Sequence, residues 1–305
     1  MRYREWLRIW LKNYVTPMRK ARTSDLYTEI AEKKIIPYLG GYDLNELTPI
    51  ILQRYVTELS QSGNTRTGRG LSSNSVNGII SVIQNSLQTA YRLGFTKEYI
   101  GDKIIRPKTT ERRIDCFTVA EQRKIEQAAL ESKTLKMRGI VICLYTGLRI
   151  GELLALTWED VDFNKGEVSI SKSCYCGKYG RMVDRVKTEH SERVIPLSGQ
   201  ILKILRLIKK ESDSEYVISS HGKPITTRSY QRSFEILQDK LHIAHRGFHA
   251  LRHTFATRAL ECGMDVKTLS EIMGHKNSAI TLNRYAHSLN EHKRAMMNKL
   301  GKNLD

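Results

Sequence analysis

The residues best suited to chemistry lie near the C-terminal end of the chain. His249 and Arg252 are three residues apart, a spacing that puts both side chains on one face of a helix. Apolar residues at helical spacing follow them and predict that helix: Phe255, Ala256, Ala259 and Leu260. Gly274-His275 comes next, and Tyr285 lies ten residues further on. A phenol with a solution pKa of about 10 is a nucleophile at neutral pH only where cations stabilise its oxyanion or a base takes its proton.

A second stretch supplies the cations. The apolar run from Ile140 to Tyr145 is followed by Gly147, which ends the predicted helix, and then by Arg149. An arginine binds phosphate through two parallel hydrogen bonds and stays charged at any working pH. Glu152 is spaced to orient the fork of Arg149, and Lys187 adds an ammonium on a predicted hairpin. Each residue alone is explained by packing or solvation, so the case for chemistry rests on the whole set.

In order and rough spacing, this set resembles the motifs of the tyrosine recombinases, the phage integrase and Xer family. The matching residues are Thr146-Gly147-Leu148-Arg149, Lys187, His249-x-x-Arg252, Gly274-His275 and Tyr285. The resemblance covers about residues 116 to 290. It implies a site-specific DNA recombinase that cleaves and rejoins strands through a 3′-phosphotyrosyl intermediate. Because each step exchanges one phosphodiester for another, the reaction needs no nucleotide cofactor, and no metal is implied.

The resemblance also assigns roles. Tyr285 would attack a scissile phosphate, whose non-bridging oxygens Arg149 and Arg252 would grip as charge builds there. Lys187 would protonate the departing 5′-oxygen. His249 would act as a general base or donor, and His275 would donate a further hydrogen bond. Glu152 would orient Arg149 without contacting the phosphate itself.

The charge of the chain is consistent with a nucleic-acid partner. The 305 residues carry a formal net charge of +18, with a pI near 9.7. Residues 1–113 contribute 19 Lys and Arg against 10 Asp and Glu, which is half of the excess. Since both halves are basic, the charge does not belong to a tail. The distribution favours a clamp of two basic domains around double-stranded DNA.

Other patterns argue against membranes and metals. The five cysteines are scattered, and Cys174-Tyr175-Cys176 has no second pair of cysteines or histidines at zinc spacing. No apolar run is long enough to span a bilayer, and the N-terminal residues do not resemble a signal peptide. We therefore expect a cytoplasmic, nucleoid-associated bacterial protein without a membrane partner.

The expected fold is mainly α with a small antiparallel sheet, in two domains. Residues 1–100 carry helical patterns over about 3–14, 25–36, 49–59 and 73–91, with predicted caps at Thr23-Ser24-Asp25, Thr48 and Ser72 or Ser73. Four helices fit the SAM-like core-binding domain of the recombinases. The polar face of the last one is open to two interpretations, a DNA groove contact or a solvent face: Ser75, Asn77, Ser81, Asn85 and Gln88.

Residues 101–113 have the composition of a basic linker, and a capping box at Thr118 and Glu121 opens a catalytic domain over 114–305. Segments 167–171, 182–187 and 193–196 are predicted strands of one small sheet. Helices are expected over about 200–210, 227–241 and 266–273. A tail helix over about 289–300 is expected to dock on the neighbouring subunit of a tetramer on DNA.

Two other functions remain compatible with the sequence. A type IB topoisomerase uses a similar set of residues to nick and reseal DNA, although the N-terminal helical domain and the tail favour a recombinase. A non-catalytic DNA-binding relative would have no physical reason to keep Tyr285. Because the chain opens with the core-binding helices, we expect a Xer-like layout rather than an additional arm-binding domain, with accessory directionality proteins as possible partners.

Overall fold

The structure, a computed structural model, describes residues 1–65, 67–109, 116–177, 180–185, 191–275 and 297. Its contacts divide the chain into two compact units, Met1–Arg112 and Arg113–Asp305. Each unit has a hydrophobic core of its own. None of the helices in these ranges is long and apolar enough to cross a membrane.

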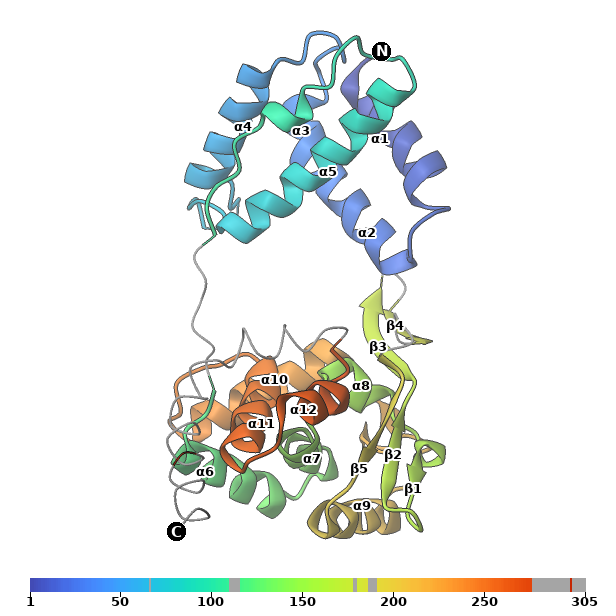
Figure 1. Ribbon diagram of the computed structural model, residues 1–305, viewed down its shortest axis with the longest axis vertical. Helices are drawn as coiled ribbons and strands as arrows, with labels where there is room; N and C mark the ends of the chain where they lie inside the picture. The colour runs from blue at the N-terminus through green and yellow to red at the C-terminus, as the bar shows by residue number, and fades with distance from the viewer. Residues whose placement is uncertain (66, 110–115, 178–179, 186–190, 276–296, 298–305) are drawn as a thin grey trace. The chain divides into compact units, whose positions relative to one another are not determined.

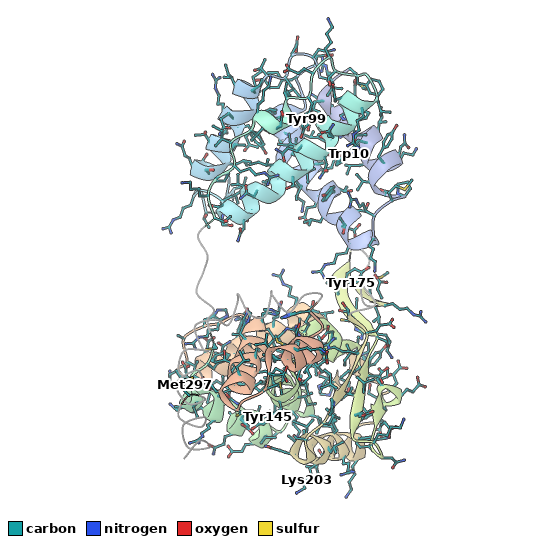
Figure 2. The ribbon with its side chains drawn as sticks, in the orientation of Figure 1. Trp10, Tyr99, Tyr145, Tyr175, Lys203 and Met297 are labelled. Atoms are coloured by element: carbon teal, nitrogen blue, oxygen red, sulfur yellow. The ribbon has the colours of Figure 1, made fainter. Side chains whose placement is uncertain are left out.

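The N-terminal unit is helical (Figure 1). Its helices are α1 (Tyr3–Trp10), α2 (Ala21–Ile30), α3 (Ile36–Leu39), α4 (Pro49–Ser62) and α5 (Ser73–Arg92), with π-helical turns at Leu11–Val15 and Ala31–Ile35. The stripe predicted on α1 is buried, and Trp6 donates from Nε1 to the carbonyl of Ser86 on α5 at 3.0 Å. Trp10, labelled in Figure 2, donates to the hydroxyl of Thr89 at 3.1 Å. These bonds fasten α1 along α5.

Helix caps in this unit follow the sequence at two of three places. Thr48 caps α4 by accepting from the amide of Ile51, and Ser72 caps α5 in the same way. The predicted cap at Thr23-Ser24-Asp25 is wrong, because α2 begins at Ala21. Ser24 is buried inside the helix, where its hydroxyl bonds to that of Thr16 at 3.0 Å. A tertiary hydrogen bond therefore takes the group that the sequence pattern assigned to a cap.

The segment predicted as a linker is bound to the N-terminal unit over its first half. Gly101–Lys103 form a 3-10 turn, and Ile104 is 5% exposed in the core of that unit. Arg106 donates to Ser81 Oγ at 3.1 Å and to Gln84 Oε1 at 2.6 Å, and Asn77 donates to the carbonyl of Pro107. Asn77 and Ser81 on the polar face of α5 are thus bonded to the following segment of the chain, while Ser75 and Asn85 are exposed. A DNA groove contact by this face stays a prediction.

Over its described residues, the C-terminal unit combines helices with three small antiparallel sheets, which confirms the predicted fold class. Its helices are α6 (Val119–Glu131), α7 (Arg138–Thr146), α8 (Ile150–Ala155), α9 (Gly199–Glu211), α10 (Thr227–Lys240), α11 (His249–Glu261) and α12 (Val266–Met273), with 3-10 turns at Leu135–Met137 and Trp158–Asp160. The capping box at Thr118 and Glu121 opens α6 as predicted. Figure 1 shows α11 beside α7 and α12, and it packs against both.

The strands differ from the single sheet that the sequence predicted. β1 (Val161–Asp162), β2 (Glu167–Ile170) and β5 (Arg193–Pro196) form one sheet in the order β1-β2-β5. β4 (Gly180–Arg185) pairs instead with β3 (Lys172–Gly177), a strand that the sequence analysis missed. β6 (Ser219–Ser220) pairs with β7 (Lys223–Pro224). After β2, β3 and β4 pair with each other as a separate hairpin. Residues 180–185 therefore do not pair with β5, which pairs with β2.

Candidate active site

The turn between α7 and α8 places Arg149. α7 ends at Gly147, which has a φ of +65° in the left-handed region that favours glycine. A Cβ at this position would lie 2.5 Å from the ring of Phe255 on α11. Leu148 is buried, and Arg149 then starts α8. The glycine thus allows both the reversal of the chain and the close approach of α11.

Replacing Gly147 by alanine should destabilise the protein more than the same change at a glycine with open space around it. Left-handed backbone costs an alanine about 1–2 kcal/mol, and overpacking against Phe255 adds roughly 1–3 kcal/mol. Gly222, which has a φ of +71° and no atom within 4 Å of the point where a Cβ would lie, is the matched control. Urea unfolding of the two variants measures the difference. Equal losses of unfolding free energy in the two variants would show that the ring of Phe255 can move aside at no cost in stability.

Glu152 is a buried carboxylate held by two arginines. Its side chain is 1% exposed. Arg149 donates to it twice, from Nη1 to Oε1 at 2.6 Å and from the backbone amide to Oε2 at 2.9 Å. Arg193 on β5 donates from Nη2 to Oε2 at 2.9 Å and from Nη1 to Oε1 at 3.2 Å. Burial alone would raise the pKa of Glu152, but the hydrogen bonds and charge of Arg193, together with the charge of Arg149, lower it to about 2.

This low pKa predicts a specific acid sensitivity. The pKa of Glu152 falls from 4.5 in the unfolded chain to about 2 in the folded one, so its ionised form stabilises the fold above pH 4.5. That contribution, about 3 kcal/mol, should be lost as the pH falls from 4.5 towards 2. Glu152→Gln should therefore be less stable than the parent protein at neutral pH, with the gap narrowing in acid. A gap independent of pH in urea titrations would contradict the assignment.

The C-terminal end of α12 gathers three arginines. α12 ends at Gly274, in the left-handed conformation. Three consecutive carbonyl oxygens there each accept from a different arginine: Ile272 from Arg193 Nε at 2.5 Å, Met273 from Arg252 Nη2 at 2.5 Å, and Gly274 from Arg149 Nη2 at 3.4 Å. The last carbonyls of a helix lack partners within it and carry partial negative charge. A guanidinium group supplies both a hydrogen-bond donor for these carbonyls and a positive charge beside them.

Arg252 joins this turn to the one that carries Arg149. It lies on α11, is 2% exposed, and donates from Nη1 to the carbonyl of Gly147 at 2.7 Å. Its Nη2 lies 3.0 Å from Nε2 of His275. The side chain of Arg149 is 37% exposed and so remains partly accessible to a ligand. Arg149, Glu152, Arg252 and His275, which the sequence pattern singled out, are therefore in one network.

The remaining candidates lie at its edge or outside the described residues. His249 is the first residue of α11 and is exposed, with its ring edge-to-face against that of His253 at 4.7 Å between centroids. Lys187, Tyr285 and, apart from Met297, the predicted tail helix over 289–300 fall outside the ranges that the structure describes.

Arg193 is the residue that the sequence analysis missed. It was assigned only to a strand, yet strand alternation puts it on the same face as Ile195, which is buried. An arginine on the inward face of a strand requires a buried partner. That pattern was the available signal, and Glu152 is the partner.

No group of three or more metal-ligating side chains is found among the residues whose placement is described.

Residues 116–292 match the phage integrase family, and residues 3–60 match the phage integrase N-terminal SAM-like domain. The chain belongs to the phage integrase family. It is a tyrosine recombinase, a site-specific DNA recombinase, as are its relatives.

Similar proteins agree with this assignment. A tyrosine recombinase XerC-like protein of Caldanaerobacter subterraneus subsp. tengcongensis is 28% identical over 290 residues, covering 84% of this chain and 71% of its own. The Tn1549 transposon integrase in complex with a circular intermediate DNA has a TM-score of 0.81 at 23% identity, with 98% and 99% of the two chains covered. A lambda integrase tetramer bound to a Holliday junction gives 0.72 at 21%, with 91% and 78% covered. The two structures show a shared fold.

Proposed function

We propose that this recombinase cleaves DNA with Tyr285 as its nucleophile. The phenolic oxygen forms a bond to the scissile phosphorus as the bond from phosphorus to the 5′-oxygen breaks. The phenol gives its proton to a general base, the role considered for His249, and the departing 5′-oxygen takes a proton from Lys187. The product is a 3′-phosphotyrosine and a free 5′-hydroxyl. Attack by a 5′-hydroxyl from another duplex reverses these steps and exchanges the strands.

One observation carries the proposal: residues more than a hundred positions apart converge on a single turn. Arg149 and Arg252 bond to the adjacent carbonyls of Gly274 and Met273, and His275 lies against Arg252. Two guanidinium groups and an imidazole beside one another are suited to the charge that builds on a phosphate during transfer. Such a cluster is costly to assemble and has no need to exist for packing alone.

The roles follow from exposure and chemistry. Arg149, being accessible, grips one non-bridging oxygen of the phosphate, and the buried Arg252 supports the second from the floor of the site. His275 adds a hydrogen bond. His249, exposed at the start of α11, acts as general base or donor, and Lys187 acts as the acid. No cofactor enters any step.

The partners follow from the charge of the chain and the family. Double-stranded DNA carrying recombination sites is the substrate, and both basic units contact it, with the N-terminal unit as the core-binding domain. On DNA the protein acts as a tetramer, with the tail over about 289–300 docked on the neighbouring subunit, and accessory proteins set its direction. The protein acts on the bacterial nucleoid in the cytoplasm. Its event is integration or excision of a mobile element or phage, or Xer-like resolution.

A nicked suicide duplex tests the proposal. Duplexes are taken from the DNA that flanks the gene, with a nick placed so that the cleaved 5′-end diffuses away and traps the phosphotyrosine. A protein–DNA complex that survives denaturing electrophoresis is expected. Failure to form it on any flanking duplex that the protein binds would favour the non-catalytic DNA-binding relative. Relaxation of supercoiled DNA without any flanking sequence would favour the topoisomerase.

A further inference from the structure

We propose that Arg193 is a positioning residue of this recombinase, which holds Glu152 and the end of α12 in the arrangement that Arg149 and His275 require. This inference rests on the proposed function, in which Arg149 and His275 bind the scissile phosphate. Arg193 itself would not touch DNA. It would act through the two groups that do.

The contacts of Arg193 account for this role. Its side chain is 6% exposed and its guanidinium donates to four acceptors. Two are the oxygens of Glu152, at 2.9 and 3.2 Å, and two are carbonyls, of Ile272 at 2.5 Å and of Ser191 at 3.2 Å. The same planar group thus bonds β5, α8 and α12 to one another. Only an arginine presents enough donors in a fixed plane to do so.

Close packing adds to these bonds. Gly274 has a φ of +61°, and a Cβ placed there would lie 3.1 Å from Nη1 and 3.2 Å from Cδ of Arg193. The arginine therefore lies directly against the turn that precedes His275. Arg149 and Arg252 bond to the carbonyls of Gly274 and Met273 in this turn. A shift of the turn would therefore move Arg149, Arg252 and His275 together.

Arg193 also controls the charge state of Glu152. The groups that face this carboxylate are Arg149 from the start of α8, Arg193 from β5 and the thiol of Cys143 from α7. Of these, Arg193 contributes most to lowering the pKa of Glu152. Without Arg193, the pKa of Glu152 would lose its largest lowering influence and rise from its value of about 2. A protonated Glu152 would hold Arg149 less tightly, so cleavage should then weaken as the pH falls.

The test compares three variants with the parent protein. Arg193→Gln removes the charge and most of the donors. Arg193→Lys keeps the charge beside Glu152 but cannot also reach the carbonyl of Ile272 in the geometry of the fork. Arg138→Gln is the control: Arg138 is 17% exposed and pairs with Glu211 at 3.5 Å. Arg138 is the first residue of α7, and Gly147 follows the last residue of that helix. The two positions are about 13 Å apart along the helix axis, so Arg138 lies away from the turn that carries Arg149.

The measurement is the rate of covalent-complex formation on the nicked flanking duplex, between about pH 5 and pH 8, at saturating protein. For Arg193→Gln we expect a rate about 100-fold lower at neutral pH, the size of a displacement by about 1 Å of groups that bind the reacting phosphate. Its loss should grow as the pH falls. Arg193→Lys should recover part of the rate and most of the parent pH profile, and Arg138→Gln should match the parent.

The outcomes separate this inference from the proposed function. If the parent protein forms no covalent complex, the proposed function fails and the inference fails with it. If the parent does, and Arg193→Gln has the rate and pH profile of Arg138→Gln, only the inference is overturned. Should Arg193→Gln fail to fold by circular dichroism, Arg193→Lys decides: a parent-like rate in that variant overturns the inference, and a reduced rate supports it.

Discussion

Tyr285→Phe should bind DNA as the parent protein does and form no covalent complex with it. The substitution removes one oxygen atom, the one that forms the bond to phosphorus, and leaves the phosphate-binding groups in place. Removal of the nucleophile in enzymes that act through covalent intermediates lowers the rate on the order of 10⁶-fold. On the timescale of a cleavage assay, that loss is complete.

Tyr145 offers a matched control on the same unit (Figure 2). Its hydroxyl donates to Glu126 at 2.9 Å, and burial together with this hydrogen bond raises the pKa of Tyr145. A phenol held protonated beside a carboxylate is the opposite of an activated nucleophile. Tyr145→Phe should therefore form the covalent complex at the parent rate.

Two measurements are made on each protein: a gel shift for binding, and denaturing electrophoresis of the nicked duplex for the covalent complex. Binding without the complex in Tyr285→Phe, and both in Tyr145→Phe, is the expected pair of results. A covalent complex formed by Tyr285→Phe would remove the nucleophile assignment outright. Mapping of the attached peptide would then identify the residue that forms it.

The local placement of Arg149, Glu152 and Arg252 could be predicted from sequence, because turn and helix rules act over short stretches of chain. Gly147 follows an apolar run and is predicted to end the helix, and α7 does end there, with Gly147 in the left-handed conformation. Arg149 and Glu152 are three residues apart, so one helical turn brings them together. His249 and Arg252 share the spacing of one helix, which the structure contains as α11.

What the sequence could not indicate depended on contacts between distant segments. The pairing of Glu152 with Arg193 joins residues 41 positions apart. The bonds of Arg149 and Arg252 to the end of α12 likewise join parts of the chain that no local pattern relates. The same limitation applies to the start of the segment predicted as a linker over 101–113, because Ile104 and Arg106 are bound to the first unit.

The strand prediction failed for a related reason. The sequence predicts strands over 182–187 and 193–196, but it does not show which strand pairs with which. β4 pairs antiparallel with β3, and β2 pairs with β5. That pairing is what presents Arg193 to Glu152. Register and partner choice, rather than secondary structure, set this part of the site.

Arg149→Ala should reduce the rate of cleavage with little effect on stability. It therefore tests catalysis more cleanly than Arg252→Ala does. Arg149 is 37% exposed, and Glu152 keeps both bonds to Arg193 when Arg149 is removed. Arg252 is 2% exposed, and its removal would leave the carbonyls of Gly147 and Met273 without their donor. Buried acceptors left unpaired cost about 1–3 kcal/mol each, so Arg252→Ala would confound catalysis with folding.

The expected loss for Arg149→Ala is roughly 2.7–4 kcal/mol of transition-state stabilisation, or about 10²–10³-fold in the rate of covalent-complex formation. Arg149→Lys should fall between this variant and the parent, because it keeps the charge but not the two parallel hydrogen bonds. Lys203, an exposed lysine of α9 labelled in Figure 2, controls for net charge. Lys203→Ala removes one positive charge away from the site and should cleave at the parent rate.

Single-turnover cleavage at saturating protein separates chemistry from DNA affinity. Arg149 is one cation among many in a chain with a net charge of +18, so its removal should weaken DNA binding only slightly. If Arg149→Ala cleaves as fast as Lys203→Ala, the guanidinium makes no bond to the phosphate that strengthens in the transition state. The convergence of Arg149 and Arg252 on the end of α12 would then serve only to join α8 and α11 to that helix.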